Sequence, residues 1–171
     1  MRAKWRGASL RPSLGWLRKH PGSAPVSMPS RLYKDEHELF RKSVTAFIDR
    51  EIAPNYERWE KEGQVSREVW KKAGAEGLLM TDIPEEYGGG GADFLFSAIM
   101  IEEMSKRVFA APGFRLHSDI VAPYILNYGS EEQKRTWLPK MAKGEVITAI
   151  AMTEPGTGSD LQSIRTTAHR S

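Results

Sequence analysis

The strongest structural signal in the chain is residues 94–106, Phe94-Leu95-Phe96-Ser97-Ala98-Ile99-Met100-Ile101-Glu102-Glu103-Met104-Ser105-Lys106. Asp93 precedes this segment and is a favourable N-cap for a helix. Leu95, Ala98, Ile99 and Ile101 make the segment too apolar all round for a helix on a protein surface. We therefore expect a helix near the centre of a helical bundle.

On the N-terminal side, a helix is expected from Asp35 to near Pro54. Apolar residues recur there with helical spacing, and charged residues occupy the opposite face. The apolar set is Leu39, Phe40, Val44, Phe47, Ile48 and Ile52, and the charged set is Arg41, Lys42, Asp49 and Arg50. A second helix is expected after Ser66, an N-cap, and Gly74 and Gly77 stop it.

The loop 83–92 holds Pro84 and four consecutive glycines, 88–91. A phosphate-binding P-loop requires Lys followed by Ser or Thr after the glycines and a strand before them, and both are missing here. The glycine run is therefore interpreted as a flexible, tight connection between helices.

Two more helices are expected after the central one. The first runs from about Ser118 to Tyr128 and is ended by Asn127 and Gly129. The next begins at a capping box formed by Ser130 and Gln133, is interrupted at Pro139 and is stopped by Gly144. Five helices with short connections predict a mainly α fold, with an antiparallel helical bundle over residues 34–144.

The character of the sequence changes at Val146. Residues 146–153, Val-Ile-Thr-Ala-Ile-Ala-Met-Thr, are short, apolar and rich in β-branched residues, which predicts a buried strand. Residues 164–168 could begin a second strand. Because an isolated strand or hairpin is barely stable in water, residues 145–171 are expected to begin a truncated β domain.

Basic residues are concentrated at the N-terminus. Residues 1–34 hold eight Lys or Arg and no acid, whereas the rest has 17 basic and 22 acidic residues, a net charge of −5. Residues 1–33 are expected to be a disordered basic leader, either a mitochondrial presequence or sequence upstream of a true start at Met28. The location is cytoplasmic in a bacterium, or the mitochondrial matrix if residues 1–30 are a presequence.

Several classes of function are excluded. The chain has no cysteine, hence no disulfide framework or thiolate site, and no run near the about 18 apolar residues of a membrane helix. The four histidines, His20, His37, His117 and His169, are too scattered for a metal site. The acidic body and the lack of a recognition-helix pattern argue against nucleic-acid binding.

The candidate ligand-binding segment is residues 150–160, Ile-Ala-Met-Thr-Glu-Pro-Gly-Thr-Gly-Ser-Asp. A strand that ends in Thr153 and turns through Pro155, Gly156 and Gly158 presents backbone N–H groups and hydroxyls without bulk. Such a turn suits a planar heterocycle with an anionic diphosphate. The same composition also fits an ordinary turn, so on spacing alone both interpretations stay open.

Several motifs together resemble the acyl-CoA dehydrogenase family, in the same order and from residue 34 to the end. They are residues 152–160 (MTEPGTGSD), 36–41 (EHELFR), 84–89 (PEEYGG), 102–103 (EE), 129–134 (GSEEQK) and 138–139 (LP). Residues 65–70 and 117–120 resemble the long-chain branch.

The resemblance implies that the chain contributes to an FAD site. Ile150, Ala151, Met152 and Thr153 would lie along the isoalloxazine, with the Met152 main chain and the Thr153 hydroxyl at its pyrimidine edge. Ser159 would lie near the FAD diphosphate and the CoA part of the substrate. The full expected cofactor set is Ile150, Ala151, Met152, Thr153, Glu154, Pro155, Gly156, Thr157, Gly158 and Ser159, with Thr157 replacing the usual alanine.

The implied reaction is α,β-dehydrogenation of an acyl-CoA thioester in fatty-acid β-oxidation, with a glutamate base and hydride transfer to FAD. In the family the base belongs to a C-terminal helical domain, so no catalytic residue is assigned and the chain alone is expected to be inactive. Glu102 and Glu103 are interpreted as a solvated helix face or partner contacts, and Glu154 as part of the turn.

The implied partners are an acyl-CoA substrate, an electron-transferring flavoprotein as electron acceptor, and further copies of the chain in a homotetramer. Two alternatives remain: an acyl-CoA oxidase-like flavoenzyme, or a helical interaction module without catalysis.

Overall fold

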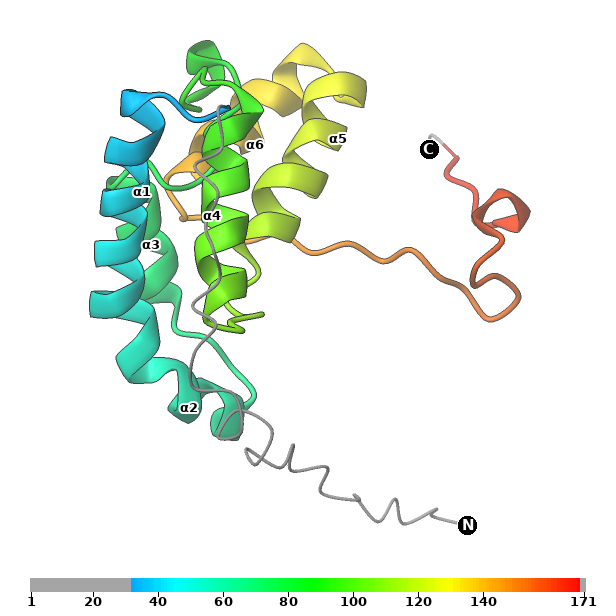
Figure 1. The fold of residues 1–171 in the computed structure, drawn as a ribbon. Coiled ribbons are helices and arrows are strands. Elements are labelled where there is room, and N and C mark those ends of the chain that lie inside the picture. Colours follow the sequence, from blue (N-terminus) through cyan, green and yellow to red (C-terminus); the bar gives the residue numbers. More distant parts are fainter. Residues whose placement is uncertain (1–31, 170–171) are drawn as a thin grey trace. The chain divides into compact units, whose positions relative to one another are not determined.

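The structure is a computed structural model that describes residues 32–169, and its secondary structure is mainly helical (Figure 1). The predicted leader, apart from Leu32 and Tyr33, lies outside the described residues. The α-helices are α1 (Asp35–Phe47), α2 (Ala53–Glu62), α3 (Arg67–Ala75), α4 (Phe94–Lys106), α5 (Ala122–Tyr128) and α6 (Glu131–Ala142). Short π- or 3₁₀-helical segments are η1 (Ile48–Ile52), η2 (Glu85–Tyr87), η3 (Leu116–Val121) and η4 (Leu161–Ser163).

The helix starts predicted from capping residues are confirmed. Ser66 accepts a hydrogen bond from the Glu68 N–H, and Asp93 accepts one from the Leu95 N–H. Ser130 and Gln133 form the reciprocal capping box that begins α6. Each of these signals depends on residues within one turn, which is why the sequence alone reveals them.

Two predicted interruptions at proline are wrong. The first helix does not end near Pro54: η1 leads directly into α2, and Pro54 lies in the first turn of α2, where its missing N–H costs little. Pro139 lies inside α6, which continues to Ala142. Leu138 and Met141 on either side of it are fully buried, so packing holds the last turn in place.

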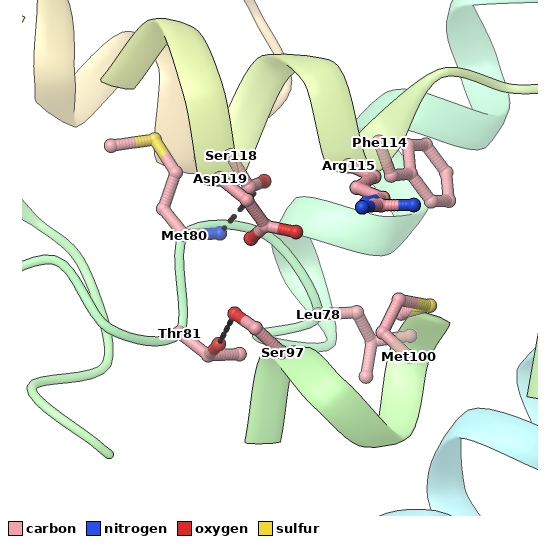
Figure 2. A pocket seen from close by; sticks show the side chains of 9 residues that line it. All are labelled: Leu78, Met80, Thr81, Ser97, Met100, Phe114, Arg115, Ser118 and Asp119. Carbon is pink, nitrogen blue, oxygen red and sulfur yellow. Dashed lines mark hydrogen bonds between the residues drawn. The ribbon is translucent and has the colours of Figure 1, made fainter. Parts of the chain in front are cut away.

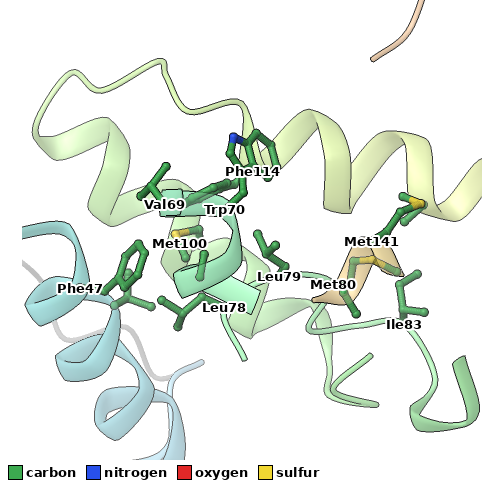
Figure 3. Packing of buried hydrophobic residues seen from close by; sticks show 14 of the residues in the cluster. Phe47, Val69, Trp70, Leu78, Leu79, Met80, Ile83, Met100, Phe114 and Met141 are labelled. Carbon is green, nitrogen blue, oxygen red and sulfur yellow. The ribbon is translucent and has the colours of Figure 1, made fainter. Parts of the chain in front are cut away.

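The helix α4 packs along α1, and its side chains Ile99 and Met100 enter the hydrophobic core. Figure 3 shows this core, in which Phe47, Trp70 and Phe114 lie near Leu78 and Leu79, and Met80 and Ile83 lie near Met141. Ala98 and Ile101, on the other side of α4, are only half-buried within the described residues. The prediction of a central helix is therefore correct for one side of α4.

The glycine loop is tight, and its glycines are needed for close approach. A Cβ at Gly89 would lie 2.2 Å from the Ile83 carbonyl oxygen, and one at Gly90 would lie 2.8 Å from that of Thr81. Backbone bonds from Gly91 to Ile83 and from Ala92 to Thr81 close the loop. The loop thus folds onto its own beginning.

The predicted strands are not formed in this structure. Within residues 32–169 no β-ladder occurs, and the one bridge joins Glu154 and Thr157. Residues 147–153 are uncoiled chain without a neighbouring strand (Figure 1). Composition favours a strand here, but a strand forms only against a second strand, and the described residues offer none.

Glu103, interpreted from sequence as solvated or as a partner contact, is buried in an ion-pair network between α1 and α4. Its carboxylate accepts hydrogen bonds from Arg41 (2.8 Å), Lys106 (2.6 Å) and Arg107 (3.1 Å). Burial alone would raise the pKa of Glu103, but these three cations lower it to about 2. Glu102 shares Arg41 and accepts from the Tyr33 hydroxyl.

The variant Glu103→Gln should lose about 3 kcal/mol of stability at pH 7, because it leaves Arg41 and Arg107 without their buried partner. The folded-state pKa is depressed, so the carboxylate stabilises fully above its unfolded value of about 4.5, and this contribution fades as pH falls toward 2. Urea unfolding of both proteins from pH 7 to pH 2.5 measures this. A constant difference across that range would contradict the assignment.

A second prediction concerns Gly144, which has φ +67° and lies against α3: a Cβ there would be 2.1 Å from the Trp70 carbonyl oxygen. The matched control is Gly63, with the same φ of +67° and no atom within 4 Å. Gly63→Ala should cost about 1 kcal/mol for the left-handed backbone alone. Gly144→Ala should cost more than about 3 kcal/mol, because a backbone clash is added. Equal costs in urea unfolding would show that α6 does not approach α3 this closely.

Candidate functional site

The chain leaves the helical part through residues 145–148, and His117 holds this exit. His117 lies in η3 and is fully buried, with its ring edge-on to Trp70 at a centroid distance of 5.2 Å. Its Nε2 lies 3.1 Å from the Met141 carbonyl oxygen, and its Nδ1 lies 3.0 Å from the Thr148 hydroxyl. Burial lowers the pKa of His117, against a smaller opposing effect of the Met141 carbonyl, so the ring is neutral at pH 7.

Beyond Thr148 the main chain is open. Residues 149–153 make no backbone hydrogen bond within the described part of the chain. Ala151, Met152 and Thr153 are exposed, Met152 to 48%, and Ile150 is partly buried. Met152 and Thr153 are thus neither helical nor enclosed by side chains, as a flavin-facing role requires.

The turn after Thr153 is folded on itself by Glu154. The Glu154 carboxylate accepts hydrogen bonds from the Arg165 N–H (2.7 Å) and from both the N–H (3.1 Å) and the hydroxyl of Thr166. The Thr166 hydroxyl is the main cause of a lowered pKa at Glu154, helped by the two backbone N–H groups. Backbone bonds between Glu154 and Thr157 close the turn.

The other predicted site residues divide into two groups. Thr157 is buried in the turn and donates to the Ser163 carbonyl (3.1 Å), so its side chain serves the turn. Pro155, Gly156, Gly158 and Ser159 are exposed, and a Cβ at either glycine would meet no atom within 4 Å. The structure therefore brings Glu154 and Thr157 together and leaves the remaining residues open.

These residues fit one side of an FAD site. The free main-chain groups of residues 149–153 and the exposed Thr153 hydroxyl suit the edge of a flat ring. Gly156, Gly158 and Ser159 leave space for an anionic group close to the backbone. Among the described residues there is no group of three or more potential metal ligands.

Three hollows lie beside the helices. One of about 490 Å³ is lined by residues of α5, α6 and the exit segment, among them Tyr124, Tyr128, Trp137, Val146 and Thr148. One of about 290 Å³ lies between α4 and the loop before η3, and includes Met104, Gly113 and Phe114. The third is small, and its lining is mainly apolar. Figure 2 shows that Asp119, Ser97 and Thr81 also lie around it, with Ser118 bonded to the Met80 N–H.

Sequence reasoning missed His117 as the holder of the exit segment. It considered His117 as a metal ligand, whereas the ring bonds Thr148, 31 residues away. The available signal was weak: a histidine followed by Ser118, with charged residues on both sides. Only the packing of η3 against α6 gives the ring this role.

No helix in the described part of the chain is long and apolar enough to cross a membrane. Among known proteins, residues 34–145 match the family model of the acyl-CoA dehydrogenase N-terminal domain. The long-chain specific acyl-CoA dehydrogenase of rat mitochondria is 53% identical over 141 residues, which cover 82% of this chain and 33% of that protein. The chain thus spans about a third of the length of this relative.

Solved structures of similar fold belong to the same family as the sequence relatives. The acyl-CoA dehydrogenase of Geobacillus kaustophilus superposes with a TM-score of 0.74 at 49% identity, covering 78% of this chain and 35% of that one. An acyl-CoA dehydrogenase of Bacillus anthracis complexed with FAD gives a TM-score of 0.67 at 39% identity, covering 78% and 23%. By sequence and by fold, the chain belongs to the acyl-CoA dehydrogenase family.

Proposed function

We propose that the chain supplies the N-terminal helical domain and the first flavin-facing segment of an FAD-dependent dehydrogenase that acts on acyl-CoA thioesters. The supporting observation is the open main chain of residues 149–153, which ends in the exposed Thr153 and leads into a turn fixed by Glu154. In this proposal residues 145–171 begin a β domain whose other strands pair with residues 146–153.

Three residues of the segment have roles in this proposal. The Thr153 hydroxyl and the Met152 main chain would donate to the pyrimidine edge of the ring, and Ser159 would lie near a phosphate of FAD and the CoA moiety. FAD supplies the hydride acceptor when it is bound. The hollow of about 290 Å³ beside Gly113 and Phe114, with Met104 in its wall, offers apolar space for an acyl chain.

The base that removes the α-proton is proposed to lie outside this chain. Glu103 is unsuited to the task, since three cations lower its pKa to about 2 and it is buried. Glu102 is bound by Arg41 and Tyr33, and Glu154 by the backbone of residues 165–166. By family membership, an electron-transferring flavoprotein is the proposed acceptor and a homotetramer the proposed assembly.

The function is tested by grafting residues 34–171 in place of the matching segment of the Geobacillus kaustophilus enzyme. The chimera should retain FAD and oxidise acyl-CoA with an electron-transferring flavoprotein as acceptor, whereas the 171-residue chain alone should retain no FAD after gel filtration. Thr153→Val in the chimera should weaken flavin binding about five- to tenfold, the value of one hydrogen bond.

The matched control is Thr167→Val, another exposed threonine, whose hydroxyl lies only near His169. Equal flavin binding by both variants would refute the role of Thr153. Rapid oxygen consumption by the chimera without the acceptor protein would favour an oxidase.

Glu154→Gln should loosen the turn that presents Ser159, because a neutral amide accepts hydrogen bonds from Arg165 and Thr166 less strongly. In the unsubstituted chain the two amide protons should follow Glu154 in a pH titration by NMR. The pKa is lowered, so the bonds should persist below pH 4.5 and be lost as pH falls through the folded-state value.

Glu145→Gln is the control, since the bond from Arg67 to Glu145 goes to its backbone carbonyl and not to its side chain. Amide shifts at residues 165 and 166 that stay constant with pH in the unsubstituted chain would argue against the Glu154 contacts.

A further inference from the structure

The exit of the chain from the helical part is fixed at its beginning by close backbone contacts. A Cβ at Gly74 would lie 2.4 Å from the Lys143 carbonyl carbon, and one at Gly144 would lie 2.1 Å from the Trp70 carbonyl oxygen. The end of α6 therefore cannot slide along α3. Beyond Gly144, Arg67 bonds the Glu145 carbonyl oxygen, and Val146 and Ile147 pack against the core. The last hydrogen-bonded residue before the open segment is Thr148, which bonds His117 through both its N–H and its hydroxyl.

The hydrogen bonds of His117 define its tautomer. A carbonyl oxygen only accepts, so Nε2, at 3.1 Å from the Met141 oxygen, must carry the proton. Nδ1 of the neutral ring is then an acceptor, and it receives the Thr148 hydroxyl at 3.0 Å and the Thr148 N–H at 3.3 Å. One ring thus links the last turn of α6 to the exit segment.

The ring is also rigid. It is fully buried, and the edge-on contact with Trp70 leaves it no space to turn. Its acceptor atom therefore has a fixed position, set by η3 and α3, before the exit segment reaches it.

Holding Thr148 has a consequence for the residues that follow. In an extended chain successive side chains point to opposite sides, so Thr148, Ile150 and Met152 share one side, and Ala149, Ala151 and Thr153 share the other. A slip of one residue would exchange the sides of Met152 and Thr153.

We propose that His117 is a positioning residue that sets the register of residues 148–153, and with it the side on which the Thr153 hydroxyl is presented. The purpose of this register rests on the proposed function, in which Thr153 faces FAD. The hydrogen bonds themselves do not depend on it.

The bond from the Thr148 N–H requires a neutral ring. A proton on Nδ1 would face this N–H, donor against donor, and break the bond, while the Thr148 hydroxyl would turn to accept from the ring. The groups against the ring are Trp70 from α3, the Met141 carbonyl from α6 and Thr148, and none of these carries a charge. Burial accordingly keeps the ring neutral at pH 7 and lowers its pKa below the ordinary range.

The test is amide hydrogen exchange of the 171-residue chain, without FAD. His117→Phe should speed exchange of the Thr148 amide about five- to tenfold, the equivalent of one lost hydrogen bond, while α1 and α4 stay protected. His37→Phe is the matched control, because His37 is equally buried but bonds Lys34 and Asp93 instead. It should leave exchange of the Thr148 amide unchanged.

Should His117→Phe fail to fold, Thr148 variants decide the question. Thr148→Ser keeps both donors and should behave as the unsubstituted chain, whereas Thr148→Val loses the hydroxyl and should exchange faster at the amide of residue 148. In the unsubstituted chain the Thr148 amide should also lose protection, after correction for the intrinsic rate, as pH falls through the His117 titration. Exchange at the amide of residue 148 that is the same in Thr148→Val and Thr148→Ser, and indifferent to pH, would overturn the proposal.

A second measurement separates the positioning role of His117 from the proposed function. In the grafted enzyme described above, Thr148→Val should weaken FAD binding and Thr148→Ser should not. Faster exchange with undiminished FAD binding would leave the register assignment in place and count against the flavin-facing role of Thr153. Unchanged exchange would refute the positioning role of His117, whatever the result for FAD binding.

Discussion

A helix that is apolar around most of its circumference has to be covered, and the arrangement of this chain follows from covering α4. The helix α1 packs along it, the side chains of residues 78–83 fill the space beneath it, and Phe114 closes the core. One charged residue of α4, Glu103, is buried in the process, and the chain surrounds it with Arg41, Lys106 and Arg107. The cost of burying this carboxylate is offset by cations from both helices and from the turn that ends α4.

The same packing places the exit segment. Because α3 and α6 touch through Gly74 and Gly144, the last turn of α6 has one position, and η3 can present His117 to both Met141 and Thr148. The residues that resemble the family signature therefore begin from a fixed point in the helical part. Packing in the core and presentation of the signature are thus connected by a short series of contacts.

The sequence predicted what depends on neighbours in the chain and missed what depends on contacts at a distance. Ser66, Asp93 and Ser130 cap helices through hydrogen bonds to the next two or three residues, so the sequence alone revealed their role. Pro139 looked like an interruption because the burial of Leu138 and Met141 beside it is a tertiary effect. For the candidate site, the motif pointed to residues 150–160, but the contacts of His117 with Thr148 and of Glu154 with residues 165–166 involve partners 11 to 31 positions away. The predicted strands needed a partner strand, which no local pattern can supply.

The unpaired segment also affects how this polypeptide behaves in concentrated solution. Residues 146–153 are uncharged, rich in β-branched side chains and free of proline, and their N–H and C=O groups beyond Thr148 have no internal partner in the described chain. Such a segment is a template for edge-to-edge association and for amyloid-like stacking. Within a completed sheet those groups would be satisfied, so a segment suited to a buried strand makes the isolated chain prone to aggregate.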